Sequence, residues 1–90
     1  MVENTNSKML SDLNEELESA REYVELAQDI SDEAESECLL AIAKDEYQHA
    51  QFLAEVLDEN GYKIPDATVT DMQEVKAMLG KFHRHAIITS

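Results

Sequence analysis

The sequence predicts an all-α fold in which two long helices form an antiparallel hairpin and a short third helix follows. Apolar residues recur three, four and seven positions apart over about residues 7–30 and again over about residues 32–60, as on one face of a helix. Only a few residues separate these two stretches, so the helices should pair antiparallel. The 90 residues of the chain correspond to one small domain, residues 1–90.

Capping residues precede both long helices. Asn6 or Ser7 can cap the first helix, and Ser31 or Asp32 can cap the second. A side-chain oxygen at such a position accepts a hydrogen bond from a backbone N–H that has no partner within the helix. We therefore expect the two helices to begin at about residues 7 and 32.

The end of the second helix and the start of the third also have sequence signals. Asn60-Gly61 is typical of a helix C-terminus, because glycine readily adopts the left-handed conformation required there. Thr70 followed by Gln73 fits the capping-box pattern at a helix start. This pattern predicts a short third helix over about residues 70–83.

The composition excludes several classes of function. Seven basic and twenty acidic residues give a formal charge of −13, which makes nucleic acid and anionic membranes poor partners and metal cations natural ones. The longest apolar run, residues 38–43, is far shorter than the roughly 20 residues of a membrane span. Cys38 is the only cysteine, which suits a reducing compartment and predicts a cytoplasmic protein. We expect Cys38 to be a small core residue.

Three ionisable residues interrupt the apolar columns of the long helices. Glu46 and His49 do so in the second helix, and Glu16 does so in the first. A carboxylate or imidazole on a buried face costs free energy unless it is compensated, and a divalent metal suits both groups. Glu16 lies 14 residues before Ile30, and Glu46 lies 14 residues after Asp32. An antiparallel hairpin therefore brings the three side chains to one height.

One chain supplies too few ligands for a closed site. A di-metal carboxylate centre in a four-helix bundle takes a Glu from each of two helices and a Glu-x-x-His from each of the other two. This hairpin carries half of that set. Two copies related by a two-fold axis would supply the whole set, so the sequence predicts a homodimer with the metal site at its interface.

The chain resembles the ferritin-like superfamily, and within it the encapsulated-ferritin type of two-helix half-ferritin. The resemblance covers about residues 9–60 and rests on Glu15-Glu16-Leu17-Glu18, Tyr23 and Asp45-Glu46-Tyr47-Gln48-His49-Ala50. It implies a ferritin-like four-helix bundle formed by two copies. It also implies a ferroxidase that oxidises Fe(II) to Fe(III) at a di-iron centre, for iron storage or detoxification.

The resemblance assigns roles to individual residues. It implies that two iron ions per dimer interface, with manganese as the alternative metal, are bound and oxidised by Glu16, Glu46 and His49. Glu15 and Glu18 match secondary metal contacts of the family, and with Glu22 they would form an entry path for iron. Tyr23 is either a hydrogen-bond donor to a metal ligand or an ordinary core tyrosine.

Partners and alternative functions remain open. The resemblance implies a ring of dimers packed inside an encapsulin shell, although the C-terminal tail contains no recognisable docking segment and Glu22 stands where the family often has an aromatic residue. One alternative is a non-enzymatic dimerising adaptor, in which the three residues form a buried polar cluster that fixes helix register. Another is a rubrerythrin-like peroxidase, which would require a redox partner because the chain has no Cys-x-x-Cys iron site.

Overall fold

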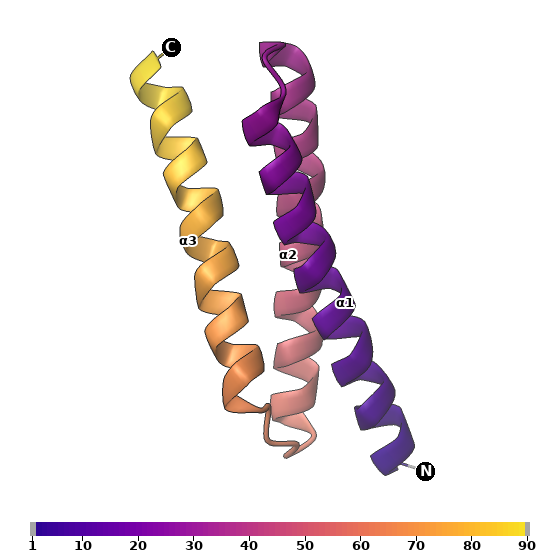
Figure 1. Cartoon of the computed structure of the whole chain (residues 1–90). Coiled ribbons are helices and arrows are strands. Elements are labelled where there is room, and N and C mark those ends of the chain that lie inside the picture. The colour runs from indigo at the N-terminus through magenta and orange to yellow at the C-terminus, as the bar shows by residue number, and fades with distance from the viewer. Residues whose placement is uncertain (1, 90) are drawn as a thin grey trace.

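The fold is a three-helix bundle in which each helix runs antiparallel to the one before it (Figure 1). The computed structural model describes the backbone of residues 2–89 and the side chains of residues 5–81. The helices are α1 (Val2–Asp29), α2 (Glu33–Glu59) and α3 (Asp66–Thr89), and the bundle measures 48 × 18 × 17 Å. Over the described residues, no helix carries an apolar stretch long enough to cross a membrane. The predicted all-α fold is confirmed for the single chain.

A compact turn joins α1 to α2. Asp32 is the N-cap of α2, and its carboxylate accepts a hydrogen bond of 3.0 Å from the backbone N–H of Glu35. The Ser36 hydroxyl donates a hydrogen bond of 2.9 Å to the carbonyl of Ala27 near the end of α1. The connection is too short to span the length of a helix, so α2 must return alongside α1. The Asp32 cap was one of the two expected from the sequence.

The C-terminus of α2 closes with the hydrogen bonds of a Schellman motif. The N–H of Tyr62 donates to the carbonyl of Leu57 at 2.9 Å, and the N–H of Gly61 donates to that of Asp58 at 3.0 Å. Gly61 has a φ of 74°, in the left-handed region that favours glycine. The stop signal predicted at Asn60-Gly61 is therefore confirmed.

We expect opposite changes in stability when the two glycines of the chain are replaced by alanine. Gly61→Ala should lower the free energy of unfolding by about 1–2 kcal/mol, because a Cβ disfavours the left-handed conformation. Gly80→Ala, within α3, should raise it by about 0.5–1 kcal/mol, because alanine is the better helix former. A Cβ at either position meets no atom within 4 Å, so crowding does not complicate the comparison. Urea unfolding of both variants measures the two changes, and a loss of stability at both positions would contradict the argument.

The start of α1 differs from the prediction. The helix begins at Val2, so Asn6 lies within its first turns rather than at its cap. Asn6 is 5 % exposed, and its side-chain oxygen accepts a hydrogen bond of 2.9 Å from the amide of Asn60. Its polar side chain therefore joins the start of α1 to the end of α2, a tertiary role that the capping pattern did not reveal.

The third helix is longer than predicted. It begins directly after Pro65, four residues before the expected start at Thr70, and it runs to Thr89 instead of ending near residue 83. The carbonyl of Pro65 accepts hydrogen bonds from the N–H groups of Thr68 and Val69, at 3.0 and 3.1 Å. Proline suits a helix start because its φ is already near the helical value and its missing N–H would have no partner there. The capping-box pattern was therefore read one turn too late.

The hydrophobic core lies along the α1–α2 contact and extends to α3. Alanines in this core allow the helices to approach closely, and burial raises the pKa of the Tyr47 hydroxyl. Cys38 is exposed, which corrects the prediction that it belongs to the core, because it lies near the turn on a side of α2 away from the buried residues. The buried core residues are Leu13, Leu17, Ala20, Val24, Ala43, Tyr47, Ala50, Leu57 and Val75.

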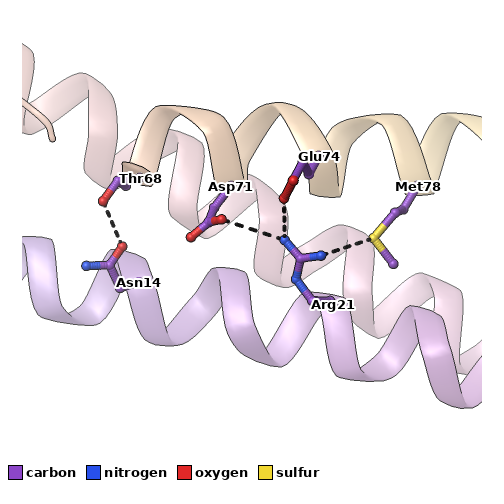
Figure 2. Close-up of polar contacts among 6 residues, drawn as sticks. All are labelled: Asn14, Arg21, Thr68, Asp71, Glu74 and Met78. Carbon is purple, nitrogen blue, oxygen red and sulfur yellow. Dashed lines mark hydrogen bonds and ion pairs between the residues drawn. The ribbon is translucent and has the colours of Figure 1, made fainter. Parts of the chain in front are cut away.

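Polar contacts hold α3 against α1 (Figure 2). The guanidinium of Arg21 forms an ion pair of 3.2 Å with Glu74, and Asp71 lies 3.8 Å from the same nitrogen. One turn-pair away, the hydroxyl of Thr68 donates a hydrogen bond of 3.0 Å to the side-chain oxygen of Asn14. These contacts fix the side of α1 on which α3 packs, and they leave another side of the hairpin open.

Candidate metal centre on the open side of the hairpin

The interrupted apolar columns lie on a side of the hairpin that α3 does not cover. Glu16 precedes Arg21 by five residues, so the two side chains leave α1 about 140° apart, and Arg21 is the one that faces α3. On α2, Ile42 is 40 % exposed and the His49 side chain is 68 % exposed. The column of Ala43, by contrast, is buried in the core. The sequence predicted that all of these columns face a core, and in the single chain the columns with the ionisable residues do not.

Glu16 and His49 meet across the hairpin. The Nδ1 atom of His49 lies 3.3 Å from Oε2 of Glu16, although the residues are 33 positions apart in the chain. The predicted meeting of these two residues at one height is therefore observed. The distance is slightly longer than the 2.7–3.2 Å of most N–H···O bonds, so the pair is a loose contact between a carboxylate and an imidazole.

Glu46 has a buried oxygen without a protein partner. Its Oε2 atom is inaccessible to solvent and forms no hydrogen bond with any of the described residues, although the residue as a whole is half-buried. Glu46 precedes His49 by three residues, so both side chains lie on the same side of α2. A carboxylate oxygen removed from water without a donor costs free energy. This is the feature of the open side that most requires an explanation.

The single chain does not gather a complete metal site. Among the residues whose side chains are described, no three His, Cys, Asp or Glu side chains come together closely enough to hold an ion. Two of the three predicted ligands, Glu16 and His49, touch each other, and Glu46 lies on the same side of the hairpin. The chain thus presents a carboxylate–imidazole contact and a separate carboxylate, as expected for half of a site.

Tyr23 lies on the same side of α1 as Glu16, two turns further along the helix. It is half-buried and packs against the hydrophobic core. Its packing agrees with an ordinary core tyrosine. Its position also leaves the hydroxyl within the same column of α1 as the candidate ligand, so a hydrogen bond to a ligand remains a prediction.

The three glutamates of the expected entry path are exposed, but they do not share the side of Glu16. Glu18 lines the groove between α1 and α3. Two residues of separation turn its side chain about 200° away from that of Glu16. Glu15 and Glu22 are also exposed. An entry path within one chain would have to pass around α1, so the proposed role of these residues stays a prediction.

Sequence reasoning missed the polar residues that place α3. Arg21 is the only basic residue between Lys8 and Lys44, and an isolated cation in an acidic helix is a signal of a specific carboxylate partner. Its partners, Asp71 and Glu74, lie on the polar side of α3 and have no distinguishing pattern in the sequence. They are recognisable only once the helices are placed side by side.

Comparisons with known proteins were made at three levels. No family model matches the chain, and no curated protein or solved structure is similar to it. The chemistry available on the open side is that of two carboxylates and one imidazole, which can bind a cation or exchange protons. The function is argued from these groups and from their surroundings.

Proposed function

We propose that the chain is a ferroxidase that oxidises Fe(II) to Fe(III) at a centre formed between two copies. One observation carries the proposal: Glu46 has a buried oxygen without a partner beside the loose, open contact of Glu16 with His49. A second copy facing the same side would bring another such set within reach. The site would then contain four carboxylates and two imidazoles.

These residues suit iron as the substrate. Carboxylate oxygens and imidazole nitrogens are donors that iron accepts, and manganese accepts them too. Four carboxylates from two copies carry four negative charges, which two divalent ions balance. Binding of the ions would also supply the missing partner of the buried Glu46 oxygen. The donor set and the unsatisfied atom are therefore consistent with the same ligand.

The surroundings of these groups favour a copy of the same chain as the covering partner. Ile42 is 40 % exposed on this side, and Leu39, Leu53 and Val56 beside it are only half-buried. Apolar side chains gain free energy when a facing surface removes them from water. A two-fold axis would bring equivalent apolar residues and equivalent ligands together, completing a four-helix bundle from two hairpins.

The chemistry requires a paired site. Two Fe(II) ions lose one electron each, and one O₂ molecule accepts both electrons with two protons to form H₂O₂; alternatively, H₂O₂ accepts two electrons and two protons to form two waters. The carboxylates of Glu16 and Glu46 would stabilise the higher charge of the product ions. His49 would hold its place through its contact with Glu16, which orients the imidazole.

Oxidation of Fe(II) under air tests the proposal. The wild-type protein should oxidise Fe(II) faster than buffer, and His49→Ala should lose most of this gain. Loss of an outer-sphere partner typically costs 10–100-fold in metal affinity or activity, so loss of a ligand should cost at least about tenfold. The absorbance of the ferric product measures the rate.

Gln48→Ala is the matched control. Gln48 is the exposed neighbour of His49 on α2, and it lines the groove toward α3 rather than the open side. Its replacement should leave the rate unchanged. Equal rates for wild type and His49→Ala would refute the ferroxidase proposal, as would an equal loss of rate in both variants.

A dimerising adaptor is the second candidate, and the direct contact of Glu16 with His49 favours it. That pair needs no metal to form, so it could fix helix register in a dimer that has no enzymatic role. An adaptor would bind no iron and would dimerise equally well after treatment with a chelator. A ring of dimers, an encapsulin shell and manganese as the metal stay predictions from the family resemblance.

A further inference from the structure

We propose that a groove between α2 and α3 binds the acidic side of α1 from a second copy, in an interface separate from the candidate metal centre. We call this groove the basic groove. Its volume is about 290 Å³, and it is lined by Lys44, Tyr47, Gln48, Gln51, Lys76, Leu79 and Gly80. The proposal does not depend on the ferroxidase function.

The basic groove has an apolar floor and cationic edges. Tyr47 is buried at the floor, and Leu79 is half-buried beside it. Lys44 on α2 and Lys76 on α3 are both exposed, so their ammonium groups are free to reach a ligand. The lining contains two basic residues and no acidic residue, in a chain with twenty acidic and seven basic residues. Such a local excess of positive charge predicts an anionic partner.

The chain itself carries a surface of matching charge. Four glutamates follow one another at spacings of three, four and three residues along α1, so they project from one side of the helix. All four are exposed. Arg21, which lies among them, is bonded instead to Glu74 of α3. We call this surface the acidic ridge; it consists of Glu15, Glu18, Glu22 and Glu25.

The dimensions of the two surfaces agree. The acidic ridge spans ten residues, about 15 Å at the helical rise of 1.5 Å per residue. The basic groove extends along α2 from Lys44 to Gln51, seven residues or about 10 Å. A convex ridge of one helix fits into the concave groove between two others, as in ordinary helix packing. The amides of Gln48 and Gln51 could donate hydrogen bonds to the incoming carboxylates.

The contact must join two copies. The acidic ridge points outward from α1, whereas the basic groove lies between α2 and α3, so the two surfaces of one chain cannot meet. A ridge that binds the groove of the next copy gives a head-to-tail contact, which generates a ring or an open filament. The candidate ligands Glu16, Glu46 and His49 lie on a third side and remain free. A second copy is the partner we infer, because it brings both complementary surfaces.

Salt separates this contact from the general repulsion between copies. A charge of −13 on each chain opposes association, and that repulsion weakens as salt rises. A contact between Lys and Glu side chains has the opposite dependence. Chelator-treated protein should therefore be larger on average at about 0.01 M salt than at about 1 M salt, where the screening length falls from about 30 Å to about 3 Å. Native mass spectrometry and sedimentation measure the sizes.

Charge reversal tests the pairing of the two surfaces. The groove variant carries Lys44→Glu and Lys76→Glu, and the ridge variant carries Glu18→Lys and Glu22→Lys. Each alone should associate at least about tenfold more weakly than wild type, because it places like charges in contact. A one-to-one mixture should restore association, since the ridge and the groove of each variant then complement those of the other.

A control with the same change in net charge is Asp45→Lys with Glu59→Lys, on an exposed side of α2 away from the basic groove. It should retain the salt-dependent association. A mixture of the groove and ridge variants that stays monomeric would overturn the proposal, and so would an equal loss of association in the control. A wild-type protein that stays monomeric at low salt but binds a poly-glutamate peptide would also overturn it, and would indicate a foreign acidic partner.

Discussion

Replacing Glu46 with Gln is expected to abolish the acceleration of Fe(II) oxidation and, in metal-free protein, to strengthen dimerisation. Two copies of Glu16 and two of Glu46 would place four negative charges at one interface. Without metal these charges repel one another, and like charges brought together at an interface cost several kcal/mol. Glu46→Gln removes two of the four charges. It also removes a carboxylate ligand from each half of the site.

The size of the metal effect follows from binding linkage. An ion present at 100 times its dissociation constant stabilises the bound state by about 2.7 kcal/mol. Two ions per dimer would contribute about 5 kcal/mol, equivalent to about a 10⁴-fold change in the dimer dissociation constant. Wild-type protein should therefore change from monomer to dimer when Fe(II), or Zn(II) as a redox-inert substitute, is added at high salt. Glu46→Gln should respond much less.

Sedimentation of chelator-treated and metal-loaded protein at about 1 M salt measures this response, because high salt suppresses contacts between exposed charges. Asp45→Asn is the matched control: Asp45 is the exposed carboxylate next to Glu46, and its neutralisation should leave both the oxidation rate and the metal response intact. If metal-free wild-type protein is already fully dimeric and unaffected by metal, a site built across the interface is wrong.

Leu57→Ala is expected to cost about 2–5 kcal/mol of the free energy of unfolding, the range measured for buried leucines. Leu57 is fully buried, and its carbonyl accepts the hydrogen bond from Tyr62 that closes α2. Truncation leaves a cavity where the hairpin meets the α2–α3 connection. Because small domains have a total stability of only about 5–15 kcal/mol, this single change could remove much of the stability of the chain.

Leu26→Ala makes the same chemical change at a residue that is 49 % exposed. It should shift the free energy of unfolding by no more than about 0.5 kcal/mol, as is usual for surface positions. Urea titrations of the two variants with the same denaturant slope give the comparison directly. Similar losses for both leucines would mean that the core does not lie where the structure places it.

The sequence was sufficient to predict the hairpin because local signals and hydrophobic periodicity agree there. Asp32 caps α2, Gly61 ends it, and the columns that contain Leu13 and Ala43 are buried. The meeting of Glu16 with His49 followed from equal distances to the turn. These features depend only on short spacings and on the length of one connection.

The sequence was insufficient where side chains have partners far away in the chain. Asn6 looked like a cap but bonds to Asn60, and the start of α3 depends on Pro65 rather than on the later Thr70. The periodicity of α2 also could not distinguish a column buried within the chain from one left exposed at Ile42. Both kinds of column are apolar, and only the position of α3 separates them.

The half-site on each chain has a consequence for how activity depends on the amount of protein. Glu16, Glu46 and His49 occur once per chain, and the described residues of one chain do not gather into a three-ligand site. Where single chains predominate, the number of complete centres would then grow with the square of the chain concentration, not in proportion to it. Halving the amount of protein would remove about three quarters of the working centres. Such a catalyst is nearly silent when dilute and becomes effective above a threshold of abundance.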